Sequence, residues 1–600
     1  MRILIFVLVM LVVLMAGGIG AVVSYLSPED PPPRIVAPSS ARSISTGDIV
    51  GMQGGPDAHA WLGIPYAEPP VATLRWRAPR PARPWQGRRE FIEFGERCPQ
   101  ISMLPGDGGK IIGDEDCLKL NVWAPLYHAK KIPQGNQRKP VMVWIHGGGN
   151  TLGGADLSIY DGALYAAEHE VVVVSVNYRL GPLGWFRHAV LREDDASPED
   201  NSGNFGTLDL IEALNWVQRN IGYLGGDPNN VTIFGESAGG SNVLSLMTSP
   251  LATGLFHKAI VQSGTFELMD VDRAENLLDD AAHPGESYSS NEVLVGLMRK
   301  DGLAVDRPNA KQRIKSSNPQ DLARYLRGRT VNELFAFYDW SFAGMLSIPR
   351  VFADGYVLPQ ETDTKVIFSN SANYNAVPII IGGNRDEIKL FTSFDPHLVE
   401  TKFNIPVGIK DPEQYERYGR FGSDMFRARA VDELVGVLRD AQGPNVWAYR
   451  FDVDDWRNLG FVDLKDLLGA AHGVELPFVF GKFPNPGRLL FTPSLQVEYD
   501  LLSATMMSYW AEFAWQSHPG FGRDGEEILW SPWENTGAAT RRIMVFDTAI
   551  DAGVRMTSDR LSVAAIINRF RADEVENGFC PAYFEMFRDA PVYNDLGCER

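Results

Sequence analysis

The chain has 600 residues and a formal net charge of −19 at pH 7, with 44% apolar and 22% charged residues. These values describe a large folded protein with ample core and exclude a disordered or collagen-like chain. The basic residues are scattered and the balance is acidic, which argues against nucleic acid as a partner, because phosphate neutralisation needs clustered Lys and Arg.

The N-terminal segment, residues 3–26, carries no charge, and it follows Arg2 and precedes Glu29. Its length favours a transmembrane anchor, which needs about 20 apolar residues. A signal peptide cleaved near the small residues 16–18 is the alternative. The flanking basic residue lies on the N-terminal side, so we expect the rest of the chain outside the cytoplasm. Residues 1–26 are therefore predicted to be an anchor that places the protein at a membrane, or a signal peptide of a secreted or periplasmic protein.

Residues 27–45 are rich in proline and read as an extended spacer. No repeat, low-complexity block or second linker follows. Residues 46–600 are therefore predicted to form one large domain.

Four cysteines fall into two sequence-local pairs, Cys98 with Cys117 and Cys580 with Cys598. Such pairs suit an oxidising compartment; three pairings are possible, and the local ones are the simplest. No C-x-x-C motif or His/Cys cluster has metal-ligand spacing. The sequence therefore predicts neither a metal nor a cofactor.

Apolar strands alternate with helical patterns between residues 140 and 265, which is typical of βαβ units and predicts an α/β fold with a mainly parallel sheet. The expected strands are 141–145, 171–176 and 231–234, and the expected helices are 208–221 and 241–247. Within the first helix, Asp209 and Glu212 are expected on faces other than the apolar one.

The third strand leads directly into Gly235-x-Ser237-x-Gly239 and then into a helix. This has the form of a nucleophile elbow, the strained turn that presents a serine hydroxyl above the sheet in α/β-hydrolases. Glycines are needed on both sides because a side chain there would collide with the neighbouring strand and helix. Ser237 is the candidate nucleophile.

A serine nucleophile needs a general base, and in this architecture the base follows the acid in the chain. Of the histidines after Ser237, His472 is best placed, in a glycine-flanked turn before the apolar run 476–480. His257 and His283 come too early, and His518 lies beside a proline at the end of a long helical pattern.

The candidate acids follow a predicted strand, 377–381, which ends in a glycine turn. A carboxylate just past a strand end is where this architecture presents its third catalytic residue. Asp386 and Glu387 both meet that description, and the spacing does not choose between them.

A second glycine turn, His146-Gly147-Gly148-Gly149, follows the strand 141–145. Such a run supplies backbone N–H groups to an oxyanion, because glycine lets successive amides point at one atom. Ala238, directly after the candidate nucleophile, would add a donor. His146 is interpreted as structural.

These motifs together resemble the type B carboxylesterase and cholinesterase family, from about Thr46 to the C-terminal region. The resemblance rests on Gly63-Ile64-Pro65-Tyr66-Ala67, on Glu115-Asp116-Cys117-Leu118, on Gly225-Gly226-Asp227-Pro228 and on Phe234-Gly235-Glu236-Ser237-Ala238-Gly239-Gly240.

The resemblance implies an α/β-hydrolase fold and hydrolysis of small ester substrates through a Ser-His-Glu triad and an acyl-enzyme. It assigns Ser237 as nucleophile, His472 as base and Glu387, in place of Asp386, as acid. It also implies an oxyanion hole formed by the last two glycines of the run and the residue after the serine, Gly148, Gly149 and Ala238. A disulfide between Cys98 and Cys117 is implied in the same way.

Some positions depart from the family pattern. Asn150 stands where an aromatic residue usually follows the glycine run, Ile388 where a glycine usually follows the acid, and Leu210 where a glutamine is common. The stretch between Cys98 and Cys117 has no aromatic residue, so a cation–π site for quaternary ammonium is not expected there. These features favour a general carboxylesterase over a cholinesterase. A membrane-tethered binding module of the same fold, and a lipase or amidase with the same chemistry, are the alternative functions.

Overall fold

The computed structural model describes residues 34–102, 109–339, 345–348, 351–402, 405–483, 487–537, 540 and 542–577. The predicted anchor or signal peptide, most of the first half of the spacer, Cys580 and Cys598 lie outside these residues. Within the described ranges, no helix combines the length and the apolar character needed to span a bilayer.

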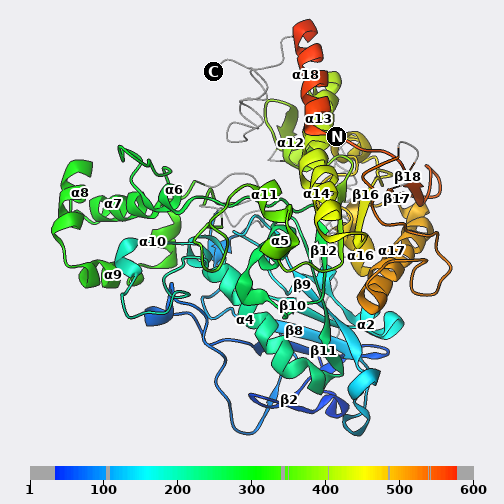
Figure 1. Cartoon of the computed structure of the whole chain (residues 1–600), viewed down its shortest axis with the longest axis horizontal. Helices are drawn as coiled ribbons and strands as arrows, with labels where there is room; N and C mark the ends of the chain where they lie inside the picture. The colour runs from blue at the N-terminus through cyan, green and yellow to red at the C-terminus, as the bar shows by residue number, and fades with distance from the viewer. Residues whose placement is uncertain are drawn as a thin grey trace, which may run out of the picture.

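A large mixed sheet of 11 strands runs through the protein in the order β18-β17-β16-β13-β12-β11-β9-β10-β8-β4-β3 (Figure 1). Its central strands, from β10 to β17, pair in parallel, and both edges are antiparallel. The strands are β3 Met52–Gly55, β4 Ala58–Pro65, β8 Lys119–Pro125, β9 Lys139–Ile145, β10 Val172–Val176, β11 Gly226–Glu236, β12 Lys258–Gln262, β13 Ile379–Asn384, β16 Val446–Phe451, β17 Ile543–Phe546 and β18 Arg555–Thr557. The predicted α/β class is confirmed.

Helices cover both faces of the sheet, because alternate residues of each central strand are apolar and point to opposite sides. On β9, Val141 and Val143 pack in the core that includes α4 (Phe205–Asn220) and α5 (Ala238–Thr248). Met142 and Trp144 pack in the core on the other face. That face is covered by α2 Ala163–His169, α16 Leu476–Phe480 and α17 Gln496–Gln516.

The predicted helix 208–221 is α4, but the expectation that its acidic residues lie away from the core is wrong, because Glu212 is buried and so is Asp209. This side chain is fully buried, and its carboxylate pairs with the buried guanidinium of Arg179 at 2.7 Å. Burial raises the pKa of Asp209, and Arg179 opposes that shift. The helix is enclosed on nearly all sides, so no face of it is left for water to solvate a charge. The ion pair with Arg179 compensates the buried carboxylate instead.

A group of short helices projects from the side of the sheet, at the left of Figure 1. They are α6 Val271–Glu275, α7 Ser290–Lys300, α8 Arg307–Ser316, α9 Pro319–Arg327 and α10 Val331–Phe335.

Further helices and a hairpin follow the central strands on the C-terminal side. They are α11 Thr364–Phe368, α12 Lys389–Thr392, the hairpin of β14 Val399–Lys402 and β15 Ile405–Ile409, α13 Pro412–Arg427, a π-helical turn Ala428–Asp432, α14 Glu433–Gln442, α15 Leu464–Leu468 and α18 Val563–Asn577. The ends of β9, β11, β12 and β13, together with the loop after β16, carry the candidate site.

Candidate active site

Ser237 lies in a strained turn between β11 and α5. Its backbone has φ 56° and ψ −125°, a conformation that residues with a Cβ rarely adopt. A Cβ built on Gly239 would lie 2.0 Å from the carbonyl oxygen of Ile145, and one on Gly235 would lie 2.6 Å from the backbone of Gly239. The predicted steric need for both glycines is therefore present, and the turn holds the serine at the N-terminus of α5.

The glycine run after β9 lies directly against this turn. A Cβ on Gly147 would lie 3.1 Å from the Cβ of Ser237. Gly148 and Gly149 have φ angles of 105° and 61°, which suit glycine. Within the described part of the chain, no protein acceptor receives the backbone N–H of Gly148, Gly149 or Ala238.

The two residues that flank the glycine run, His146 and Asn150, contact other parts of the protein. The ring of His146 stacks on Tyr178 with centroids 4.5 Å apart, and its Nδ1 lies 2.9 Å from the carbonyl oxygen of Gly147. The Oδ1 atom of Asn150 accepts a hydrogen bond of 2.9 Å from Asn242 on α5. The position that is usually aromatic in the family thus carries a polar link between the loop and α5.

Glu387 and His472 meet although 85 positions separate them. The Nδ1 atom of His472 lies 2.6 Å from Oε2 of Glu387; the Glu387 side chain is buried, and the His472 side chain is 10% exposed. The other carboxylate oxygen of Glu387 accepts hydrogen bonds from Ser263 Oγ at 2.6 Å and from the backbone N–H of Asn384 at 2.7 Å. Glu387 therefore has a fixed orientation toward His472, whereas the neighbouring Asp386 contacts other groups.

The remaining ring nitrogen of His472 faces the serine turn. Nε2 lies 3.1 Å from Oε1 of Glu236, the residue before Ser237. Among the described residues, no hydrogen bond joins Nε2 to Oγ of Ser237. The structure thus brings the candidate acid and the candidate base together at bonding distance and places His472 beside the residue that precedes Ser237.

The charges around His472 are strongly biased toward carboxylates. Burial alone would lower the pKa of the imidazole, but Glu236 and Glu387 outweigh burial and raise the pKa of His472. Burial raises the pKa of Glu236, and His472 opposes this shift. Glu475 is a third buried carboxylate, and its pKa is also raised, mainly by burial. One imidazole therefore sits among three carboxylates in a region of low dielectric.

Sequence reasoning assigned no role to three of these residues. Glu236 occupies the variable position before Ser237 in the glycine turn, and Glu475 lies just after the turn that carries His472. Ser263 carried no signal because it follows an ordinary buried strand, β12. Its φ of 49° and its bond to Glu387 appear only in the folded chain. Glu475 accepts hydrogen bonds from Gln262 and Asn384.

The expected disulfide joins Cys98 and Cys117, whose Cα atoms are 5.0 Å apart. This confirms the first of the two predicted local pairs.

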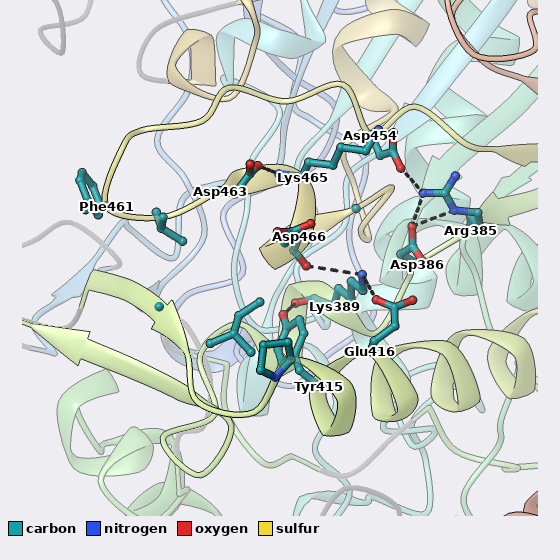
Figure 2. Close-up of a pocket in the computed structure, with 15 residues that line it drawn as sticks. Arg385, Asp386, Lys389, Tyr415, Glu416, Asp454, Phe461, Asp463, Lys465 and Asp466 are labelled. Atoms are coloured by element: carbon teal, nitrogen blue, oxygen red, sulfur yellow. Dashed lines mark hydrogen bonds and ion pairs between the residues drawn. The ribbon is translucent and has the colours of Figure 1, made fainter.

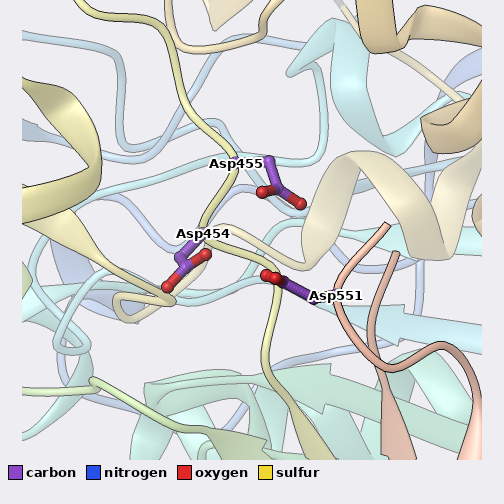
Figure 3. A group of neighbouring side chains, drawn as sticks. All are labelled: Asp454, Asp455 and Asp551. Atoms are coloured by element: carbon purple, nitrogen blue, oxygen red, sulfur yellow. The ribbon is translucent and has the colours of Figure 1, made fainter. Parts of the chain in front are cut away.

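Three carboxylates, those of Asp454, Asp455 and Asp551, form a group away from Ser237 that resembles a cation site (Figure 3). Their oxygens lie within 4.8 Å of one another. However, Asp454 pairs with Lys465 at 2.9 Å and with Arg385 at 2.6 Å, and Asp455 accepts a hydrogen bond from Thr548. Two protein cations already compensate this group, so its donor set does not call for a metal.

The model of the Carboxylesterase family matches residues 38–404 and 408–559. The chain belongs to the carboxylesterase family. Members of this family are carboxylic ester hydrolases, and the α/β-hydrolase fold of their solved structures is also the fold of this chain.

Two curated relatives cover most of the chain. It is 32% identical to the fumonisin B1 esterase of Sphingopyxis macrogoltabida over 532 residues, which is 86% of this chain and 88% of the relative. It is 33% identical to the para-nitrobenzyl esterase of Bacillus subtilis over 505 residues, 82% of this chain and 92% of the relative. A solved carboxylesterase of Geobacillus stearothermophilus superposes with a TM-score of 0.60 at 27% identity, covering 86% of this chain and 97% of that structure.

Proposed function

We propose that this carboxylesterase hydrolyses carboxylic esters through a triad of Ser237, His472 and Glu387. The observation that carries the proposal is the 2.6 Å contact between His472 Nδ1 and Glu387 Oε2 beside a strained serine turn. A serine, an imidazole and an orienting carboxylate are the groups that acyl transfer to a hydroxyl requires.

In the first step, Nε2 of His472 takes the hydroxyl proton of Ser237 as Oγ attacks the ester carbonyl. Nε2 must turn from Glu236 to the adjacent serine for this transfer, a local adjustment of the kind that substrate binding brings about in such sites. Glu387 accepts from Nδ1–H and stabilises the imidazolium that forms. His472 then returns the proton to the departing alcohol, which leaves an acyl group on Oγ.

The tetrahedral oxyanion of each step needs fixed donors. The amides of Gly148, Gly149 and Ala238 are proposed to supply them, because these amides lack protein acceptors in the described chain and flank the serine turn. The N-terminus of α5 adds a favourable field. Water, activated by His472, then attacks the acyl-enzyme and releases the carboxylic acid.

The location of the protein is proposed from the sequence. The uncharged segment 3–26 supports export with a membrane anchor, or secretion after cleavage, and the Cys98–Cys117 disulfide suits an oxidising compartment. Fractionation of cells that make the full chain, beside a chain that starts at Arg34, distinguishes anchored from released protein.

The test of function uses soluble protein that starts at Arg34, assayed on p-nitrophenyl esters of increasing acyl length beside Ser237→Ala. We expect turnover by the wild type and a loss of at least roughly a thousandfold in the variant. The acyl-length profile then defines the substrate range. Equal inertness of both folded proteins across the series would contradict the proposal and favour a binding module.

A further inference from the structure

We infer that Asp386 is a positioning residue of this site, which clasps the loop that carries Glu387 to the loop that carries His472. This inference rests on the proposed function of those two residues. The two loops are here called the acid loop, residues 384–387, and the base loop, residues 469–475.

The base loop needs an anchor because His472 does not follow its strand directly. β13 ends at Asn384, only three residues before Glu387, so the sheet itself places the acid. β16 ends at Phe451, and residues 452–471 separate it from His472. Contacts with the acid loop therefore help to place the imidazole: Nδ2 of Asn384 donates to the carbonyl oxygen of Ala471 at 2.6 Å, and the N–H of His472 donates to the carbonyl oxygen of Glu387 at 3.3 Å.

Asp386 adds two hydrogen bonds between the acid loop and the base loop, both to Ala470. Its backbone N–H donates to the carbonyl oxygen of Ala470 at 2.9 Å, and its Oδ2 accepts from the backbone N–H of Ala470 at 2.9 Å. The side chain is almost fully buried. A carboxylate that accepts a buried amide makes a charge-assisted bond, which is stronger than a neutral one. The clasp thus ends two residues before His472 and one residue before Glu387.

Gly469 allows the loops to approach this closely. Its φ is 51°, and a Cβ at this position would lie 2.5 Å from Oδ2 of Asp386. Any larger residue would push the carboxylate away from the amide of Ala470. Gly469 therefore has a steric role that the sequence spacing did not reveal.

The clasp is braced from outside by a charged network. Arg385 donates from Nε and Nη2 to Oδ2 of Asp386, at 3.0 and 2.8 Å, and from Nη2 to Asp454 at 2.6 Å. Figure 2 shows these residues on the wall of a cavity of about 670 Å³, with Lys465 beside Asp454. Asp466 lines the same cavity with an exposed carboxylate. Among the lining residues, Arg385, Asp454 and Lys465 are paired with one another and Arg385 with Asp386, and this charged group is interpreted as support for the two loops.

The experiment compares Asp386→Ala with Asp386→Asn and with the control Asp466→Asn, all in the chain that starts at Arg34. Asp386→Ala keeps the backbone N–H that donates to Ala470 but leaves the buried N–H of Ala470 without its acceptor, which loosens the base loop. We therefore expect this variant to lower kcat by roughly a hundredfold with little change in KM, the effect of a misplaced catalytic group. Asp386→Asn keeps an acceptor for Ala470 and should stay within about tenfold of the wild type. Asp466→Asn should match the wild type.

A readout independent of turnover is the proton between His472 Nδ1 and Glu387, observed by NMR in protein with ¹⁵N-labelled histidine. We expect a strongly downfield resonance in the wild type, in Asp386→Asn and in Asp466→Asn, and its loss in Asp386→Ala. A folded Asp386→Ala protein that keeps this resonance, kcat and the pH profile would overturn the inference. If Asp386→Ala does not fold, Gly469→Ala is measured instead, and unchanged kcat and resonance in that variant would overturn it equally.

The two proposals fail differently. If the wild type and Ser237→Ala are equally inert on every ester, the proposed esterase activity fails. The NMR comparison still decides whether Asp386 holds the two loops together.

Discussion

The serine turn and the pair of acid and base loops hold their proposed catalytic residues by different physical means. Around Ser237, backbone sterics decide the geometry: glycines at 235 and 239 let β11, β9 and α5 approach within van der Waals contact. Around Glu387 and His472, polar contacts between distant segments decide it, through Ser263, Asn384 and Asp386. A turn fixed by excluded volume is intolerant of added atoms, whereas loops fixed by hydrogen bonds are sensitive to lost partners.

The largest effect is expected from Gly239→Ala, which tests the steric half of this comparison. The new Cβ would meet the carbonyl oxygen of Ile145 at 2.0 Å, a backbone atom that cannot move without the strand. We expect ester hydrolysis to fall below detection and the free energy of unfolding to drop by about 2 kcal/mol or more, as for other overpacked sites. Turnover and urea denaturation measure both.

Gly408→Ala is the matched control, because a Cβ there meets open space. Wild-type stability of Gly239→Ala would show that the elbow is not fixed by sterics.

The next largest effect is expected from Glu387→Gln, which tests the polar half. The amide keeps the shape of the side chain but removes the charge that orients Nδ1–H of His472 and stabilises the imidazolium. We expect kcat to fall by roughly a thousandfold or more, with the stability of the protein largely kept.

The exposed Glu400→Gln serves as control for loss of a carboxylate elsewhere. If the kcat of Glu387→Gln stays within tenfold of the wild-type value, Glu387 is not the acid of the triad, and the other carboxylates near His472 become the candidates.

The smallest effect, a shift in pH dependence, is expected from Glu236→Gln. Because Glu236 and Glu387 raise the pKa of His472, the wild-type kcat/KM should rise with pH through an apparent pKa above the ordinary 6.5 of histidine. Removing the Glu236 charge makes protonated His472 less favourable, so this apparent pKa should fall toward the ordinary value of histidine. The pH profile of kcat/KM from pH 5 to 10 measures the shift.

Glu475→Gln should move the profile in the same direction by less, since Glu475 is the weaker of the two influences on His472. A profile that is unchanged, or displaced to higher pH, in Glu236→Gln would contradict the electrostatic account of His472.

The sequence by itself determined the features that depend on local order. Strand, glycine turn and helix follow one another around Ser237, and the apolar runs of the central strands, alternating with helical patterns, predicted a mainly parallel sheet. The glycine loop after β9 was equally visible, because a run of glycines after a buried strand is a local pattern. The position after the strand 377–381 limited the candidate catalytic acid to Asp386 or Glu387. Only the resemblance to a family chose Glu387.

Only the tertiary structure decided the features that depend on contacts between distant segments. The pairing of Asp209 with Arg179, the bond from Ser263 to Glu387 and the clasp between Asp386 and Ala470 join residues 30, 124 and 84 positions apart. Their partners have no fixed sequence spacing, because burial and hydrogen-bond geometry select them after the sheet has brought the strand ends together. Asp386 and Glu387 are neighbours of the same type in the sequence, and the fold turns one toward Ala470 and the other toward His472.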